Sequence, residues 1–228
     1  MPGYMTKLER IRVDGVAALQ IRSLLDRQQY ADPLGEAEAL GISAANWPLF
    51  GLIWPSGLHL AAALAARPLR PSERILELGC GLGIASLVAH RLGARVTASD
   101  VHPLAGAFLR ENARLNRLTP LTYCHGDWAV PLDERRASPH GARLEGLFEL
   151  VLGSDILYER DDAGQLPRFI AEHAARVGEV LIVDPNRANR SPFHRSMARL
   201  GYELRETLLR DPLGPGGPYS GRLLHYRR

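Results

Sequence analysis

The chain is nearly without lysine and has very little cysteine. Lys7 is the only lysine among 228 residues, so almost all of the basic residues are arginine. They are spread along the chain, and no dense run of them indicates a nucleic-acid groove. Cys80 and Cys124 are too few for a disulfide framework, which is typical of a reducing compartment. We therefore expect no nucleic-acid partner and no structural disulfides.

Long apolar runs are absent as well. The first fifteen residues contain no apolar core of signal-peptide length. The longest apolar stretch, residues 57–66, is far shorter than the ~20 residues that a membrane span needs. We therefore expect a cytoplasmic protein that does not cross a membrane, either a monomer or a weak dimer.

Residues 1–48 differ from the rest of the chain. Two apolar stretches flank Asp14 and Gly15, a pair that favours a tight hairpin turn. A polar loop with at most one helical turn follows, and the aromatic and proline-rich residues 46–57 are predicted to be irregular. We divide the chain into an N-terminal extension or lid, residues 1–48, and a main domain, residues 49–228.

The main domain alternates strand-like and helix-like segments, which predicts an α/β fold. Repeated strand–helix units form a Rossmann-like, doubly wound sheet that is mostly parallel and covered on both faces. The last two strands, joined by a glycine- and proline-rich loop, add an antiparallel C-terminal edge. The strands are expected at 74–78, 95–99, 121–125, 148–153, 180–183, 202–210 and 221–226. The helices are expected at 57–66, 84–92, 103–118, 165–177 and 191–200, the last with Ser191 as N-cap. Residues 131–146 are expected to form a polar surface loop.

A glycine-rich turn follows the first strand of this domain, in the segment RILELGCGLGIAS. Glycines at alternate positions, Gly79, Gly81 and Gly83, indicate a ligand that lies against bare backbone. A phosphate-binding P-loop needs Lys-Ser/Thr after its last glycine, whereas isoleucine and alanine follow here. The dinucleotide spacing G-x-G-x-x-G/A is not met either. The pattern is instead E-x-G-x-G-x-G, beginning at Glu77.

Acidic residues at successive strand ends narrow the choice of ligand. The carboxylate of Glu77 repels a pyrophosphate and suits an ammonium group, such as that of S-adenosylmethionine. Asp100 ends the next strand, in the place that typically binds ribose hydroxyls. Asp127 and Trp128 follow the third strand and are candidates for the adenine amino group and an aromatic wall. Together they predict S-adenosylmethionine as the cofactor.

From residue 49 onward the chain resembles the class I, seven-β-strand methyltransferases that use S-adenosylmethionine. It is more narrowly similar to the family-16 group, which includes protein lysine methyltransferases. The stretches LIWPSGLHLA, LELGCGLG, SDVHPLAGAFLRENARLN, GDW and GSDILYE carry the resemblance. It implies that Trp54 packs beside the cofactor and that the D-x-x-Y element from Asp155 to Tyr158 faces the methyl acceptor. The expected cofactor-binding residues are Trp54, Glu77, Gly79, Cys80, Gly81, Gly83, Asp100, Val101, Asp127, Trp128 and Ser154.

The residues alone also support a role for the D-x-x-Y element. The strand before it is apolar throughout and is expected at the centre of the sheet. A carboxylate that leaves this strand beside the glycine turn costs desolvation unless a cation or hydrogen-bond donors meet it. A protonated amine acceptor would be such a partner for Asp155, with Tyr158 as a pocket wall. The alternative, a helix N-cap aspartate with a packed tyrosine, stays open at this point.

We expect a methyltransferase that N-methylates a protein lysine, with Asp155 and Tyr158 on the acceptor side. One alternative is a small-molecule N- or O-methyltransferase with residues 1–48 as its lid. Another is a non-enzymatic module that only binds the cofactor. A nucleic-acid amino-methyltransferase would carry [DN]-P-P-[FYW] where this chain has DILY. The family resemblance places a pocket-rim turn at Asp184–Asn186, and histidine spacing predicts no metal site.

Overall fold

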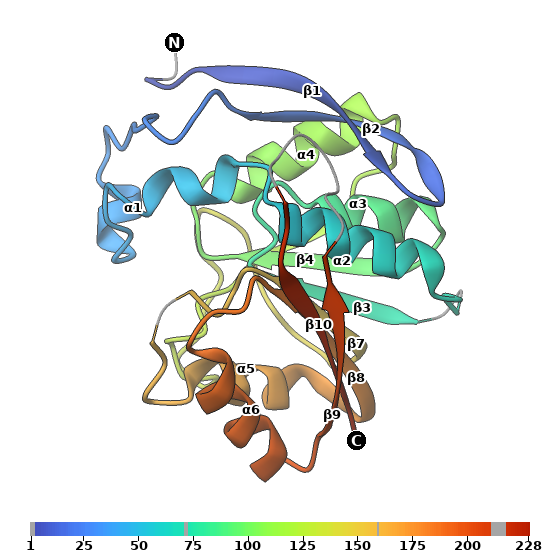
Figure 1. Cartoon of the computed structure of the whole chain (residues 1–228). Coiled ribbons are helices and arrows are strands. Elements are labelled where there is room, and N and C mark those ends of the chain that lie inside the picture. The colour runs from blue at the N-terminus through green and yellow to red at the C-terminus, as the bar shows by residue number, and fades with distance from the viewer. Residues whose placement is uncertain (1–2, 71–72, 159, 211–217) are drawn as a thin grey trace.

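The computed structural model describes residues 3–70, 73–158, 160–210 and 218–228 (Figure 1). The N-terminal extension holds strands β1 (Thr6–Val13) and β2 (Val16–Leu24) and the short helix α1 (Glu36–Ala39), and the 3₁₀ helix η1 (Trp47–Gly51) spans its boundary with the main domain. The helices of the main domain are α2 (Pro55–Ala66), α3 (Ile84–Arg91), α4 (Ala105–Leu115), α5 (Gln165–His173) and α6 (Arg190–Arg199). Its strands are β3 (Arg74–Leu78), β4 (Arg95–Asp100), β5 (Thr122–His125), β6 (Ala142–Arg143), β7 (Phe148–Ser154), β8 (Ala174–Asp184), β9 (Glu203–Leu209) and β10 (Gly221–Arg227).

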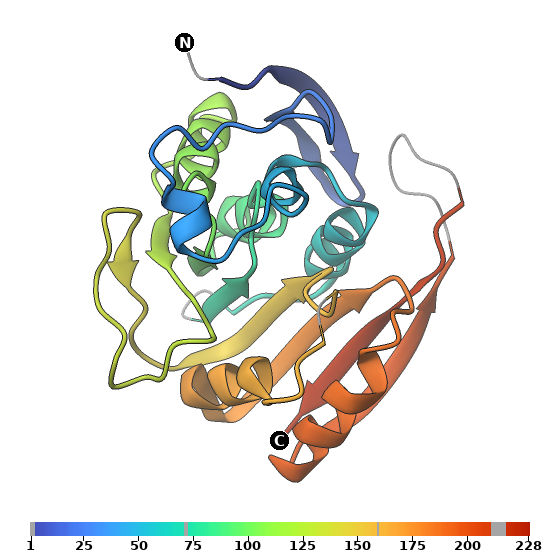
Figure 2. The ribbon, with the colours of Figure 1, turned by 90° about the vertical axis from the view of Figure 1, so that its left-hand side faces the viewer.

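The main sheet confirms the predicted doubly wound fold. Its strands lie in the order β6-β5-β4-β3-β7-β8-β10-β9. Neighbours from β6 through β8 pair in parallel, and β10 pairs antiparallel with both β8 and β9. Helices α2, α3 and α4 cover one face and α5 and α6 the other (Figure 2). The central strands are therefore apolar on both faces, because each face is buried under helices.

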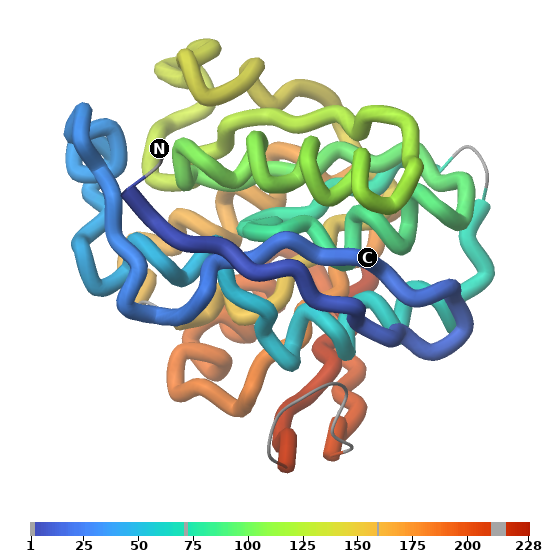
Figure 3. The backbone as a smooth tube through the Cα atoms, turned by 90° about the horizontal axis from the view of Figure 1, so that it is seen from above, coloured from blue at the N-terminus to red at the C-terminus, as the bar shows by residue number. Residues whose placement is uncertain are grey.

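The N-terminal hairpin forms as predicted and packs on the helical layer. Gly15 takes a φ of +82° in the turn between β1 and β2. The hairpin runs along α4 (Figure 3), where Asn112 and Asn116 bond the edge of β2. Their side-chain oxygens accept hydrogen bonds from the backbone N–H groups of Arg22, at 2.8 Å, and Gln20, at 2.9 Å. These two side chains satisfy strand-edge groups that would otherwise need water or another strand.

Helix α5 and the strand after it differ from the sequence prediction. The helix was expected to run to residue 177, yet it ends at His173, and Ala174 already begins β8. Ala174 pairs with Phe148 of β7, and the register shifts before Leu150 pairs with Glu179. Ladder pairing with β7 and burial of Ala174 override the local helical preference of this stretch.

The starts and ends of two other helices also differ. Helix α6 begins at Arg190 with Asn189 at its N-cap, not with Ser191, and no side chain caps it. Pro192 still lies in the first turn, where its missing N–H costs nothing. Helix α4 is shorter than predicted because Arg117 takes a φ of 55°, a left-handed conformation that ends a helix.

The expected surface loop at 131–146 is partly structured. It contributes β6 to the edge of the sheet, and Arg135 and Leu144 are buried within it. The loop that joins the last two strands was predicted from 211 to 221, and residues 211–217 lie outside the described residues.

The segment Trp47–Ala66 has the length and apolar composition of a membrane span, with a mean hydropathy of 1.6. In the fold it is two elements, η1 and α2, joined by extended backbone at Leu52 and Trp54. Leu60 and Leu64 of α2 are fully buried between the sheet and α3. We interpret the segment as an element of the hydrophobic core.

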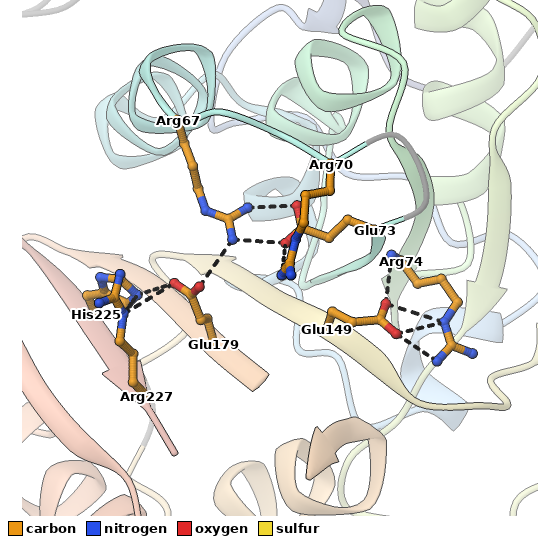
Figure 4. A network of polar contacts seen from close by, with 8 residues as sticks. All are labelled: Arg67, Arg70, Glu73, Arg74, Glu149, Glu179, His225 and Arg227. Atoms are coloured by element: carbon orange, nitrogen blue, oxygen red, sulfur yellow. Dashed lines mark hydrogen bonds and ion pairs between the residues drawn. The ribbon is translucent and has the colours of Figure 1, made fainter. Parts of the chain in front are cut away.

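Ion pairs link the elements at the amino end of β3 (Figure 4). Glu73, whose side chain is fully buried, accepts two hydrogen bonds from Arg67 at 2.8 and 2.9 Å and one from Arg70 at 3.2 Å. Arg67 also reaches Glu179 of β8, which pairs in turn with His225 of β10. The network therefore ties the end of α2 to three strands, at the opposite end of β3 from the glycine turn.

Candidate active site

A cavity of about 620 Å³ opens at the carboxyl ends of the central parallel strands. Ligands of open α/β sheets bind at this end, and the volume is in the range of small-molecule sites. All of the predicted cofactor-binding and acceptor-side residues line this cavity except Gly83, whereas the predicted rim turn Asp184–Asn186 does not line it. The fold thus brings together side chains from the ends of β3, β4, β5 and β7, which are far apart in the chain.

The glycine turn needs glycine for two separate reasons. Gly79, Gly81 and Gly83 have φ values of 58°, 50° and 73°, which side chains rarely adopt. A Cβ on Gly81 would also lie 2.7 Å from the carbonyl oxygen of Phe50. Gly83 does not line the cavity and is the N-cap of α3. A Cβ on Gly83 would lie closer than van der Waals contact to the side chain of Leu109 in α4. A side chain at residue 83 would need both a left-handed backbone and a shift of the Leu109 side chain.

Glu77 is buried beneath the turn and bonded to the start of α3. Its carboxylate accepts hydrogen bonds from the backbone N–H of Ser86 at 2.8 Å and from the Ser86 hydroxyl at 2.5 Å. Burial raises the pKa of Glu77 to about 7, although the bonds from Ser86 oppose this rise. A cationic group in the cavity would therefore favour the ionised form of Glu77.

Asp100 fastens the glycine turn to the end of β4. One carboxylate oxygen accepts a hydrogen bond from the N–H of Gly81 and the other from the N–H of His102, both at 2.8 Å. Burial raises the pKa of Asp100, and these backbone bonds oppose the rise. Each carboxylate oxygen has two lone pairs, so both can accept a further bond from a ligand hydroxyl.

Aromatic rings and a neutral histidine complete this part of the wall. The Trp128 ring reaches within 3.9 Å of the place where a Cβ on Gly79 would stand. His102 stacks on Phe50 with ring centroids 3.7 Å apart, and burial lowers the pKa of His102 to about 3. Its Nδ1 accepts a hydrogen bond from Leu104, so the neutral ring carries its proton on Nε2. No described residue accepts a hydrogen bond from that buried Nε2.

The N-terminal extension, predicted as a whole to be an extension or lid, supplies individual wall residues that no sequence motif indicated. Arg27 lines the cavity and its guanidinium lies 4.9 Å from the centroid of the Trp54 ring, a cation–π contact. The Trp54 indole N–H donates to the carbonyl of Leu49 at 2.8 Å, which fixes the ring. Residues 40–42 and Asn46 line the cavity too. Only their position in the fold reveals them, because they belong to no pattern with a chemical meaning.

Asp155 stands at the exit of β7, directly beside the glycine turn. The next residue, Ile156, packs against Gly79, where a Cβ would lie 2.8 Å from its side chain. Asp155 has a φ of 58° and caps no helix, because α5 begins ten residues later with Gly164 at its N-cap. Tyr158 is 42% exposed and lines the cavity. The alternative of an N-cap aspartate with a packed tyrosine is therefore wrong.

Arg187 is the cation that meets Asp155. Its guanidinium donates to Oδ1 of Asp155 at 2.5 Å, and its backbone N–H donates to Asp184 at 2.7 Å. Arg187 follows the turn that the family resemblance placed at the pocket rim, and it lines the cavity. The sequence indicated the turn, but the pairing across 32 residues is visible only in the fold.

These residues fit S-adenosylmethionine. Two buried carboxylates, a glycine turn without side chains and an aromatic wall suit a cationic adenosyl ligand. The buried Nε2–H of His102 is an unsatisfied donor at the same cavity. Such a donor is normally matched by an acceptor, which a bound ligand can provide.

Comparison with known proteins agrees with this geometry. A family model described as "Lysine methyltransferase" matches residues 49–199. An electron transfer flavoprotein beta subunit lysine methyltransferase of Danio rerio is 31% identical over 160 residues, which are 68% of this chain and 57% of that protein. The Xenopus laevis protein of the same name is 33% identical over 147 residues, 62% of this chain and 54% of that protein. The chain thus spans little more than half the length of these relatives.

Solved structures show the same fold. Magnesium protoporphyrin IX methyltransferase from Synechocystis PCC 6803, determined with bound S-adenosylmethionine, aligns with a TM-score of 0.57 at 19% identity, covering 75% of this chain and 77% of that one. The predicted methyltransferase fold is confirmed, and the family assignment supports the predicted cofactor, S-adenosylmethionine. Because the family model matches more than half of its residues, this chain belongs to the lysine methyltransferase family.

Proposed function

We propose that this protein methylates the side-chain amine of a lysine in another protein, with S-adenosylmethionine as the methyl donor. The observation that supports it best is that one cavity is lined both by the glycine turn with its buried carboxylates and by Asp155 at the exit of β7. The family to which the chain belongs, and the names of its relatives, support a lysine as the acceptor.

The cofactor would be held by residues at the ends of β3, β4 and β5. Bound S-adenosylmethionine supplies an activated methyl group on a sulfonium, so the protein needs no nucleophile of its own. In this proposal Glu77 faces the ammonium group and Asp100 accepts bonds from the ribose hydroxyls. Asp127 and Trp128 hold the adenine, and the other expected cofactor residues, Trp54, Cys80, Val101 and Ser154, line the rest of the cavity.

The acceptor amine would enter beside Asp155 and Tyr158. An amine attacks only in its neutral form, and in-line transfer depends mainly on positioning and on the exclusion of water. Oδ1 of Asp155 is bonded to Arg187, so Oδ2 can accept a hydrogen bond from a neutral amine and orient it. The amine loses its proton to solvent before it attacks, and Tyr158, which lines the cavity and is 42% exposed, lies where the cavity meets solvent.

Residues 1–48 would act with residues 49–228 as a wall or lid over the cavity. Arg27, Asn46 and residues 40–42 of the extension already line it.

The direct test is to incubate the purified protein with methyl-labelled S-adenosylmethionine and a cell lysate. We expect label in a protein band, methyllysine in that band by mass spectrometry, and at least a tenfold loss of label with Asp155→Asn. Label in small molecules alone would favour a small-molecule N- or O-methyltransferase. Cofactor binding without any label would favour a non-catalytic binding module and would contradict the proposal.

A further inference from the structure

Two carboxylates surround Arg187 at the acceptor end of the cavity. Asp155 comes from the exit of β7 and Asp184 from the last position of β8. Arg187 bonds Asp155 through its guanidinium, whereas its Nε lies 4.0 Å from Oδ2 of Asp184, too far for a hydrogen bond. Asp184 is fully buried, and no described residue bonds its Oδ2 or the Nε of Arg187. The Arg187 guanidinium therefore balances the negative charge of the acidic corner, by which we mean the carboxylates of Asp155 and Asp184.

An uncompensated carboxylate would work against an amine acceptor. A lysine amine has a pKa of about 10.4 in water, so most of it is protonated at neutral pH. A free carboxylate stabilises the ammonium form further, and that form has no lone pair for attack. The same carboxylate is useful only if it orients the amine without holding it as an ammonium.

We propose that Arg187 keeps the acceptor amine reactive by neutralising Asp155, which leaves Asp155 to orient the amine but not to hold it as an ammonium. Arg187 is thus a positioning residue that acts through Asp155, and the inference rests on the proposed function. The guanidinium also places a positive charge at the corner where the amine binds, which disfavours a second cation there.

Other ionisable groups also face the acidic corner, and their influence on the amine has to be distinguished from that of Arg187. Arg190 in the first turn of α6 lies near Asp184, and Tyr219 ahead of β10 faces both aspartates. Burial raises the pKa of Tyr219 to about 12, so it stays neutral in the working range. Tyr158 lies at the cavity mouth, and Glu77, Asp100 and Asp127 line the cofactor side. Burial raises the pKa of Glu77 to about 7, so its protonation would alter cofactor affinity as well as turnover.

The first test follows the pH dependence of kcat with the acceptor protein found by labelling. We expect Arg187→Met to lower kcat at pH 7 about tenfold and to move the acid limb of the kcat profile upward by about one pH unit, the effect of a unit charge several ångströms away. Arg187→Lys, which keeps the charge, should keep the limb within a few tenths of a unit. Arg190→Met is the matched control, because it removes a neighbouring arginine that does not line the cavity, and it should leave the limb in place.

The second test needs no turnover. Propylammonium chloride is titrated into each variant saturated with S-adenosylhomocysteine, and binding is followed by calorimetry. We expect Arg187→Met to bind propylammonium at least tenfold more tightly than the wild type, and Asp155→Asn/Arg187→Met to return to the wild-type value. Affinity for S-adenosylhomocysteine, measured across the same pH range, should be equal in wild type and Arg187→Met, which separates the effect from Glu77.

Each outcome decides one of the two proposals. Unchanged propylammonium binding in Arg187→Met, or an acid limb that does not move while KM for the acceptor rises, would overturn the role of Arg187 and reduce it to an ordinary contact. A wild-type protein that methylates no acceptor, with the propylammonium result as expected, would refute the proposed function and leave the charge balance of Arg187 supported.

Discussion

At the scale of single residues, the glycine turn is constrained both by its left-handed backbone and by its contact with Phe50, and a pair of substitutions can separate the two. Gly81→Val adds a side chain to a left-handed residue and places Cβ 2.7 Å from the carbonyl of Phe50. We expect the wall formed by η1 to shift and affinity for S-adenosylhomocysteine to fall at least tenfold, about 1.4 kcal/mol, as measured by calorimetry. Gly93→Val is the control, because Gly93 has a φ of +88° with nothing within 4 Å. It should lose stability but keep the affinity, and an equal loss of affinity in both variants would show that strain alone is responsible.

Asp155 allows a second prediction at this scale. Asp155→Asn keeps the shape of the side chain and suits the left-handed backbone, since asparagine adopts that conformation readily. We expect affinity for S-adenosylhomocysteine within a few-fold of wild type and methyl transfer at least tenfold lower, a barrier rise of about 1.4 kcal/mol. Asp162→Asn, at an exposed aspartate outside the cavity, should change neither. Lost cofactor affinity with normal turnover per bound cofactor would instead place Asp155 in the cofactor site.

At the scale of elements, the ion-pair network of Figure 4 joins α2 to the sheet. Hydrogen bonds and charge from Arg67 and Arg70 hold the pKa of Glu73 below its ordinary value, against the opposing effect of burial. A carboxyl group with a lowered pKa stabilises the fold above its unfolded pKa of about 4.3, and this contribution is lost as the pH falls through the lower folded value. The network is therefore fully effective at neutral pH.

Glu73→Gln tests that element-level contribution. Glu73→Gln removes the charge that accepts the hydrogen bonds of Arg67 and Arg70, while Arg67 keeps its ion pair with Glu179, so we expect a loss of about 2 kcal/mol in unfolding free energy at pH 7. The difference from wild type should shrink as the pH falls below the unfolded pKa of about 4.3 and then through the lowered folded pKa of Glu73, where the wild-type carboxyl becomes protonated. Glu149→Gln breaks the more exposed pair with Arg74 and should cost less than about 1 kcal/mol. Chemical denaturation at several pH values measures both, and a pH-independent cost for Glu73→Gln would argue against the charge as its cause.

At the scale of the whole molecule, the question is whether residues 1–48 belong to the working site. They line the cavity but are held to the main domain mainly by the hairpin on α4 and by the aromatic contacts of Trp47 with Phe50 and His102. We expect S-adenosylhomocysteine to slow amide exchange in residues 40–46, because the ligand would occupy the space that they wall. Strand β9, at the far edge of the sheet, is the internal control and should exchange at an unchanged rate. Unchanged amide exchange in residues 40–46 would show that the extension takes no part in cofactor binding.

The cytoplasmic location and the monomeric or weakly dimeric state stay predictions.

The sequence by itself determined the order of the main helices and strands, though not the short strand β6, and the character of the site. Apolar periodicity located the central strands, and the rule that parallel strands end at one edge of the sheet placed Glu77, Asp100, Asp127 and Asp155 together. The need for glycine that comes from the left-handed backbone of the turn was likewise readable, whereas the contacts with Phe50 and Leu109 were not. These inferences needed only short-range patterns and a known topology.

Only the tertiary structure decided how distant residues meet. Phe50 lies against Gly81, the extension walls the cavity, and Arg187 bonds Asp155 because the fold closes those distances. The end of α5 at His173 has the same origin, since pairing of Ala174 with Phe148 outweighed local helix propensity. Such contacts depend on the packing of whole elements against one another, and no local pattern in a single sequence encodes the distance between two residues on different elements.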